Sequence, residues 1–584
     1  MNNPEPERRG TNALFHPPIP EYPTLADWER RRERLEMRIR AAAGIYPEPP
    51  KTPLNPTVTG ETQIDGVRIQ NLRLETAPGF YSTGNLYLPT RLEQPAPAVA
   101  CPHGHAATGR FEDTEKFSVV ARCVTLARHG NVVFSYDMVG VNDSMQIPHH
   151  YKSARAYLWS VSLLGLQLWN SVRALDYLSS LDEVDSGRLA CVGASGGGTQ
   201  TFLLTAIDRR VSVSAPVVMV SASMQGGCVC ENAPHLRLDA NNVEIAAMAA
   251  PRPLLIVSAT GDWTRTSPDI EYPAIREIYK IYGAEERVHH VQVDAGHNFN
   301  RESRQAVYEW FGRWLHGEDD PDRWIETPYE LPPVEQRRVF PTGLPDGTLT
   351  EEALIDRFIA ESAARPVMNR RVLNTLYACA LNVSLPSAPS AEQVDAQFHP
   401  AKNADAPLLL IEKSGNGAQY DPAPFLEKGC SVLFFNADVE PTPDRPSHDL
   451  TFNLSDGALR VQKVLNACAY ALTLSERVCL VGGLWSALAL PYLDEIECAS
   501  LHLEGVERTD RFFEENAFIP GIRKAGDLAA AAILRAPHAL RLHGIKNAEP
   551  YASVLQAYAN ADVADQLTVS PEPASADDIL SCFA

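Results

Sequence analysis

The sequence lacks any apolar run that approaches the roughly 20 residues a bilayer-spanning helix needs. Residues 1–9 also lack the apolar centre of a secretory signal. We therefore expect no membrane partner, and we expect the protein to reside in the cytoplasm.

Positive charge is scarce as well. The 584 residues include 73 aspartates and glutamates against 52 lysines and arginines, which gives a formal net charge of −21 at pH 7. Nucleic acids and anionic membranes attract proteins with basic patches. The charge balance argues against both as partners, and we interpret the acidity as a contribution to solubility.

Cysteine pairs at the spacing of a zinc site are missing. The chain has 11 cysteines, an odd number, and Cys191 and Cys479 lie inside apolar runs, as reduced core residues do. Cys228 and Cys230 have no second pair at a suitable distance along the chain, so we interpret them as structural.

Two neighbouring histidines, His103 and His105, resemble half of a metal site. Metallohydrolases with this His-x-His pattern need an Asp-His pair soon afterwards, and residues 106–109 supply none. We expect no metal and no organic cofactor.

The most informative segment that is present covers residues 188–206. An apolar run ends in the pentapeptide GASGG at residues 193–197, and a helix-compatible stretch follows. This is a Gly-x-Ser-x-Gly motif in the strand–turn–helix context of a nucleophile elbow. The glycines permit a strained turn and a close approach of helix and strand. The pattern predicts that Ser195 is a catalytic nucleophile.

Two partners for this serine follow in the chain order Ser, Asp, His that the nucleophile elbow uses. Asp262 comes just after an apolar run over residues 253–259, and His297 follows another run over residues 288–293. Polar residues at the carboxyl ends of parallel strands converge at one edge of the sheet. We predict a catalytic triad of Ser195, Asp262 and His297.

The acid of this triad stays open at this point. Asp269 follows Asp262 by a few residues. Glu231 lies in residues 224–234, which leave an expected strand over residues 211–220 toward the same edge. Either carboxylate is an alternative to Asp262.

An oxyanion hole can be placed from the same pattern. One donor is the backbone N–H of Gly196, directly after the nucleophile, and the other comes from the loop after the third strand. That strand ends over residues 98–101, and the backbone N–H of His105 is the candidate in its loop. Such donors each matter by about 10²–10³ in rate.

Substrate contacts are less sharply indicated. Residues 138–159 mix polar and aromatic side chains after the expected fourth strand. This composition suits a sugar ester and equally suits an ordinary lid. The candidates for substrate contact are Trp159, Trp263, His103 and Glu231.

From residue 98 onward, strand and helix patterns alternate, which implies an α/β fold with a mostly parallel sheet flanked by helices. We expect an N-terminal arm and helix in residues 1–56 and a catalytic domain in residues 57–320. Residues 321–399, whose first part is rich in Pro, Asp and Glu, are the expected linker and helical connection.

Residues 400–584 repeat the pattern in weakened form. The stretch over residues 478–485 parallels the nucleophile elbow, with Leu484 in place of the serine. No histidine follows His543, so no residue there can act as the base. We expect a domain that has lost its chemistry and that buttresses the first domain, shapes the wall of the cleft or holds a homo-oligomer together.

Residues 24–316 resemble bacterial serine esterases of the α/β-hydrolase superfamily, in the neighbourhood of acetyl xylan esterases, glucuronoyl esterases and dienelactone-hydrolase-like proteins. The resemblance rests on residues 103–105, 136–140, 193–197, 250–253, 261–263 and 296–297. It implies an α/β-hydrolase fold, followed by a degenerate α/β-hydrolase-like domain. It also implies a serine carboxylic ester hydrolase that deacylates carbohydrate or related small esters through an acyl-enzyme.

Three alternatives remain at this point. A serine peptidase of the oligopeptidase type shares the Ser-x-Gly-Gly elbow, but the residues before Ala98 are too few for the large preceding domain of those enzymes. A non-catalytic scaffolding protein would not need the complete trio in the first half. An acyltransferase would use an alcohol in place of water.

Overall fold

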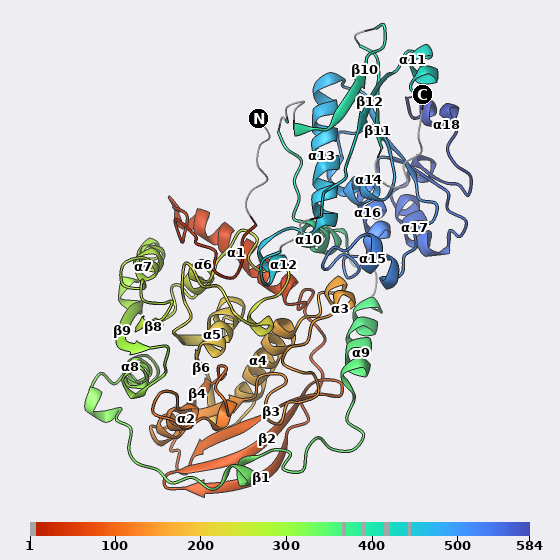
Figure 1. Ribbon diagram of the computed structural model, residues 1–584. Coiled ribbons are helices and arrows are strands. Elements are labelled where there is room, and N and C mark those ends of the chain that lie inside the picture. The colour runs from red at the N-terminus through yellow and green to blue at the C-terminus, as the bar shows by residue number, and fades with distance from the viewer. Residues whose placement is uncertain are drawn as a thin grey trace. The chain divides into compact units, whose positions relative to one another are not determined.

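The computed structural model describes residues 8–364, 369–387, 389, 393–403, 405–413, 421–441 and 445–583 (Figure 1). The chain forms two compact units. The first comprises Met1–Lys152, Val161–Ala360 and Pro446–Asn453, and the second comprises Ser153–Ser160, Glu361–Arg445 and Leu454–Ala584.

A nine-stranded sheet forms the centre of the first unit, in the order β1-β2-β3-β5-β4-β6-β7-β8-β9. β1, β2, β3 and β5 pair antiparallel in that order, and every neighbouring pair from β5 to β9 is parallel. The strands are β1 (Thr57–Ile64), β2 (Val67–Ala77), β3 (Phe80–Pro89), β4 (Ala96–Ala100), β5 (Val132–Tyr136), β6 (Val184–Ala194), β7 (Val211–Val217), β8 (Leu254–Gly261) and β9 (Val288–Gly296).

The sequence of these strands explains their burial. β4 and β5 are buried at every residue, whereas β2, near the antiparallel edge, largely alternates buried and partly buried residues. Parallel strands covered on both faces read as continuous apolar runs, and antiparallel strands with one wetter face alternate. The apolar runs after residue 98 therefore marked the parallel part of the sheet correctly.

Helices flank this sheet (Figure 1). Side chains of α1, α4, α5, α6 and α7 pack into one hydrophobic core, and those of α2 and α8 pack into a second. These helices are α1 (Leu25–Ala42), α2 (Val119–Arg128), α4 (Leu163–Ser179), α5 (Gly196–Ile207), α6 (Asn242–Ala247), α7 (Glu271–Ile281) and α8 (Arg301–Phe311). The predicted α/β fold with a mostly parallel sheet is confirmed.

Residues 321–360, which the sequence analysis assigns to a linker, belong to the first unit. The side-chain amide of Asn71 on β2 donates to the carbonyls of Gln336 and Arg338, and that of Asn85 on β3 donates to the carbonyl of Arg337. These bonds attach the segment to β2 and β3, in the antiparallel part of the sheet.

The second unit has a seven-stranded sheet in the order β10-β12-β11-β13-β14-β15-β16. β10 pairs antiparallel with β12, and all other pairs are parallel. This is the order and direction of β3-β5-β4-β6-β7-β8-β9 in the first unit, which confirms the predicted second α/β-hydrolase-like domain. The strands are β10 (Ala396–His399), β11 (Leu408–Glu412), β12 (Ser431–Phe435), β13 (Val478–Gly482), β14 (Cys498–His502), β15 (Ala539–His543) and β16 (Leu567–Val569).

The turn that corresponds to the nucleophile elbow differs between the units. In the second unit Gly483 lies between β13 and α14 (Leu484–Ala489), with φ −121°. The sequence pattern places Leu484 at the position of the serine. The helix begins one residue earlier than that pattern predicts, so Gly483 takes the place of the serine. A glycine has no nucleophile, so the turn itself carries no chemistry.

No helix in the described ranges combines the length and hydropathy that crossing a bilayer requires.

Candidate active site

Ser195 lies between β6 and α5 with φ 57° and ψ −123°. A positive φ is uncommon for a residue with a side chain and is typical of strained functional turns. A Cβ added at Gly193 or Gly197 would lie 2.5 Å from the carbonyl oxygen of Pro102. Only glycine fits on either side, so this turn depends on the motif found in the sequence.

Asp262 and His297 meet at the neighbouring strand ends. Asp262 directly follows β8 and His297 directly follows β9. The Nδ1–H of His297 donates to Oδ2 of Asp262 at 2.8 Å. The other carboxylate oxygen of Asp262 accepts from the backbone N–H and the hydroxyl of Thr264, both at 2.6 Å. The carboxylate is therefore fixed in the orientation that holds the imidazole.

The two alternative acids are placed differently. The carboxylate of Glu231 accepts from the backbone N–H groups of Gly227 (2.7 Å) and Cys228 (3.1 Å), so it holds its own loop. Asp269 is exposed. Asp262 is the carboxylate that contacts His297.

A pocket of about 350 Å³ joins Ser195 to His297. Trp263 forms part of its wall, with its ring centroid 4.3 Å from that of His297. Phe117 also lines the pocket, and its ring centroid lies 5.7 Å from that of the same imidazole. The lining residues are Gly104, His105, Ala106, Lys116, Phe117, Ser118, Val119, Arg122, Ala194, Ser195, Trp263, His297 and Phe299.

Arg122 on α2 also lines this pocket, and no motif in the sequence points to it. Its side chain is buried, and its guanidinium lies 4.8 Å from the ring centroid of Phe299. Within the part of the chain that the structure describes, its Nε and Nη2 have no hydrogen-bond partner. Arg122 thus offers unused donors and a positive charge next to the pocket.

The loop after β4 packs directly against the elbow. A Cβ at Gly104 would lie 2.5 Å from the carbonyl oxygen of Ala194 and 3.2 Å from Cβ of Ser195. Gly196 is the first residue of α5, where backbone N–H groups have no acceptor within the helix. A Cβ at Gly196 would lie 2.8 Å from Cε1 of His105. The two residues predicted to form the oxyanion hole are therefore adjacent beside Ser195.

His103 is buried away from the pocket lining, with 1% of its surface exposed. Its Nδ1–H donates to the carbonyl of Gly104 (2.8 Å), and its Nε2 accepts from the backbone N–H of Met138 (3.0 Å). Burial lowers the pKa of His103 to about 4, so it is neutral at pH 7. Its contacts hold the loop after β4 rather than a substrate.

Trp159 also lies outside the set of pocket-lining residues. It belongs to the second unit, where its indole N–H donates to Oδ1 of Asp510 at 2.9 Å. The guanidinium of Arg523 lies 5.3 Å from its ring centroid. Of the four candidates for substrate contact, Trp263 is the one that lines the pocket.

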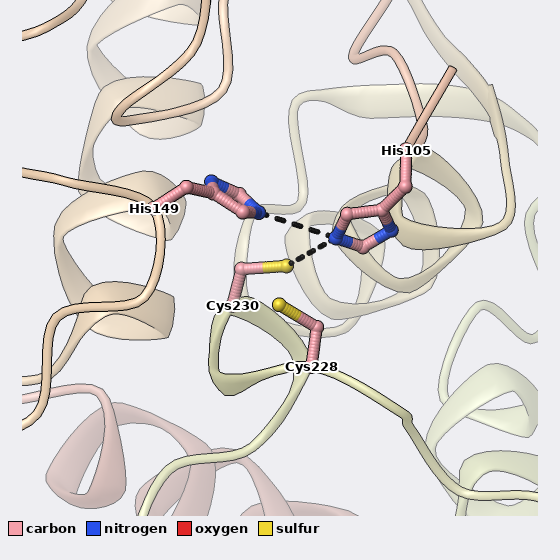
Figure 2. Close-up of side chains that lie close together, drawn as sticks. All are labelled: His105, His149, Cys228 and Cys230. Atoms are coloured by element: carbon pink, nitrogen blue, oxygen red, sulfur yellow. Dashed lines mark hydrogen bonds between the residues drawn. The ribbon is translucent and has the colours of Figure 1, made fainter. Parts of the chain in front are cut away.

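Four side chains of types that bind metals lie close together (Figure 2), and one of them, His105, also lines this pocket. They are His105, His149, Cys228 and Cys230. Hydrogen bonds from the Cys230 thiol and from both imidazoles lower the pKa of the Cys228 thiol. The histidines and cysteines do not form a recognisable motif in the sequence, because 125 residues separate His105 from Cys230.

No family model matches the sequence. The hydrolase YtaP of Bacillus subtilis (strain 168) is 23% identical over 259 residues, which cover 41% of this chain and 84% of that protein. The glucuronoyl esterase from Solibacter usitatus is 14% identical over 51% of this chain and 100% of that chain, with a TM-score of 0.37.

A stronger likeness is found to the methylesterase BT1017. That solved structure is 32% identical, and the match covers 61% of this chain and 78% of that chain with a TM-score of 0.51. Together with the sheet order and the turn at Ser195, this likeness identifies the family. The chain belongs to the esterases of the α/β-hydrolase superfamily, in the family of methylesterase BT1017.

Proposed function

We propose that the protein is a serine carboxylic ester hydrolase that acts on carbohydrate esters through an acyl-enzyme. The observation that carries this proposal is the 2.8 Å bond from Nδ1–H of His297 to Asp262, with the imidazole lining the same pocket as Ser195. With Nδ1 protonated, Nε2 is the nitrogen left to act as a base.

In the proposed mechanism Oγ of Ser195 attacks the ester carbonyl while Nε2 of His297 takes its proton. The imidazolium that forms is stabilised by Asp262, and it returns the proton to the leaving alcohol. The backbone N–H groups of Gly196 and His105 stabilise the oxyanion. Water, activated by His297, then hydrolyses the acyl-enzyme.

The proposed substrate class is a methyl ester of a sugar acid. A relative that is 32% identical is named a methylesterase. Arg122 supports a substrate with oxygen-rich groups near the ester, because its buried Nε and Nη2 lack acceptors among the described residues. The pocket is otherwise largely apolar in its lining, which suits a small leaving group such as methanol.

An acetylated sugar is the second candidate, since the resemblance of the sequence extends to acetyl xylan esterases. Hydrolysis of methyl galacturonate and methyl glucuronate esters should be compared with that of acetylated xylose and of p-nitrophenyl acetate. Release of methanol faster than acetate, at equal substrate concentration, supports the methyl ester.

Ser195→Ala tests the nucleophile. We expect ester hydrolysis to fall by about 10⁴-fold or more, because loss of a triad nucleophile removes the acyl-enzyme route. A fluorophosphonate probe, which reacts with activated serines, should label the wild type and not this variant.

Ser118→Ala is the matched control. Ser118 lines the same pocket, but its Oγ accepts from the N–H of Ala121 as the cap of α2. Labelling should persist in this variant, and its cost should appear in stability, at about 1 kcal/mol. Labelling that persists in Ser195→Ala would refute the proposed mechanism.

A further inference from the structure

The four side chains of Figure 2 come from three loops of the first unit. His105 comes from the loop after β4, His149 from the loop after β5, and Cys228 and Cys230 from the segment after β7. Their ligand atoms all lie within 4.8 Å of one another. Both cysteines are free thiols.

The distances within the group match the spacing of ligands around one ion. Nε2 of His105 lies 3.2 Å from Nε2 of His149 and 3.2 Å from Sγ of Cys230. Around a tetrahedral zinc ion, bond lengths of about 2.0–2.1 Å to nitrogen and 2.3 Å to sulfur give separations of about 3.3 Å and 3.6 Å. Only small side-chain shifts would therefore be needed to bind zinc.

The ring of His149 is already oriented as a ligand. Its Nδ1–H donates to the carbonyl of Val139 at 2.6 Å, which leaves the lone pair of Nε2 directed at His105. A hydrogen bond from the second ring nitrogen to a carbonyl is the usual support for a histidine that binds metal. Two ring nitrogens at 3.2 Å need a proton or a cation between them.

The Cys-x-Cys segment is also held in place before any ion binds. The buried carboxylate of Glu231 accepts from the N–H groups of Gly227 and Cys228. The side-chain amide of Asn232 donates to the carbonyl of Cys228 at 2.8 Å. Glu231 has no part in the proposed catalytic mechanism. Its bonds instead support the loop that carries the two sulfurs.

We propose that His105, His149, Cys228 and Cys230 bind one Zn²⁺ ion in a closed tetrahedral site beside the Ser195 pocket. Two thiols and two imidazoles favour zinc over magnesium and calcium, which prefer oxygen ligands. Four protein ligands leave no open position, so the ion does not act on the ester. It joins three loops that surround the nucleophile.

The position of His105 gives the ion a second effect. The imidazole of His105 would bind zinc, while its backbone N–H is a proposed oxyanion donor beside Gly196. Zinc therefore holds the donor in position. This positioning role rests on the proposed function, whereas the binding of zinc does not.

Metal content is the first test. The full chain, purified under reducing conditions without chelators, should contain one zinc ion per molecule by elemental analysis. After removal of zinc and addition of Co²⁺, we expect visible d–d bands and near-ultraviolet sulfur-to-cobalt charge transfer, which report thiolate ligands in a tetrahedral site. A metal-free protein that shows neither band with Co²⁺ overturns the proposal.

Variants locate the ion. Cys230→Ser and His149→Ala should each lose stoichiometric zinc and the cobalt bands. His149→Ala is included because Cys230 is buried and its replacement can disturb folding. The matched control is Cys498→Ser, from the cluster of Cys479, Cys498 and Cys582 in the second unit, which also groups possible ligands. Cys498→Ser should keep its zinc. Full zinc content in Cys230→Ser and His149→Ala overturns the proposal, whether or not Cys498→Ser loses zinc.

The positioning role has its own readout. His149→Ala should lower kcat for ester hydrolysis with a smaller change in KM, and it should lower Tm by several degrees. Ser195→Ala should keep its full zinc content although it is inactive. A wild-type protein that binds zinc but has no esterase activity would refute the proposed function and leave the metal site standing.

Discussion

Ser195 has a backbone conformation that serine seldom adopts, with φ at 57°. Such conformations cost on the order of 1–3 kcal/mol and persist only where the surrounding structure fixes them. Close contacts of Gly104, Gly193 and Gly197 with neighbouring backbone atoms provide that constraint. A side chain at any of these glycines would collide with neighbouring backbone atoms, so the glycines are needed for close packing as well as for the turn.

The identity of the triad acid can be tested by a single substitution. In Asp262→Asn we expect kcat for ester hydrolysis to fall by about 10³–10⁴-fold, because an amide cannot hold His297 in the required tautomer or stabilise its charged form. Steady-state kinetics with a chromogenic ester provide the measurement.

Asp269→Asn and Glu231→Gln are the controls for this change. Asp269 is exposed, so its variant should keep activity within a few-fold. Glu231→Gln should act on its loop and reduce zinc binding rather than the chemical step. A loss in Asp269→Asn as large as that in Asp262→Asn would reassign the acid.

The N-terminal ends of two equivalent helices show the difference between the units at the scale of the element. In the first unit, α5 begins at Gly196 beside the pocket. In the second, the carboxylate of Glu412 accepts from the N–H groups of Gly483 (3.1 Å) and Ser486 (3.3 Å) at the start of α14. A helix N-terminus attracts negative charge. The second unit supplies that charge itself, so the place where an oxyanion would bind is taken.

Glu412→Ala tests this capping role. We expect it to destabilise the protein by about 1–3 kcal/mol, because the buried hydroxyl and N–H of Ser486 and the N–H of Gly483 would lose their acceptor. Glu412→Gln keeps an acceptor oxygen and should cost less. The urea midpoint of unfolding distinguishes them, and equal midpoints for the wild type and Glu412→Ala would contradict the role. Both variants should keep the esterase activity of the wild type, because Glu412 lies in the second unit.

The two units of the molecule share one strand order, because the seven strands of the second sheet follow the order of β3 to β9 in the first. Only the first unit combines this order with a serine at the elbow, a carboxylate after β8 and a histidine after β9. Stability and chemistry are thus separable, since the second sheet keeps the packing without the reactive side chains. The stability of the chain also depends on pH, through buried groups whose pKa differs between the folded and the unfolded state.

His316 provides a test of that sensitivity. Burial, with smaller contributions from Arg188 and His129, lowers its pKa from 6.5 to about 4. The unfolded chain therefore takes up a proton below about pH 6.5 that the folded chain does not, so stability falls as pH drops from 6.5 toward 4. Relative to His316→Gln, the wild type should lose about 1 kcal/mol more between pH 7 and pH 5, after allowance for partial exposure.

Urea unfolding at the two pH values measures this difference. The glutamine can keep a hydrogen bond to Asn131, which Nε2 of His316 contacts at 3.0 Å. Parallel losses of stability in the wild type and the variant would show that His316 does not contribute to the pH dependence.

The sequence alone determined the strands, the elbow and the chain order of Ser195, Asp262 and His297, because apolar runs and glycine patterns are local signals. It also identified the second sheet domain, whose strands repeat the same runs. The placement of Leu484 at the second elbow was one residue off, because short apolar runs leave the start of a helix poorly defined.

The folded structure, and not the sequence, shows which carboxylate contacts His297, that His103 is buried, and that Trp159 belongs to the second unit. It also brought His105 and His149 to Cys228 and Cys230. β4 and β5 are neighbours and β7 lies two strands from β4, so the loops after them meet at one edge of the sheet. Proximity of that kind comes from the order of strands in space, and no spacing along the chain encodes it.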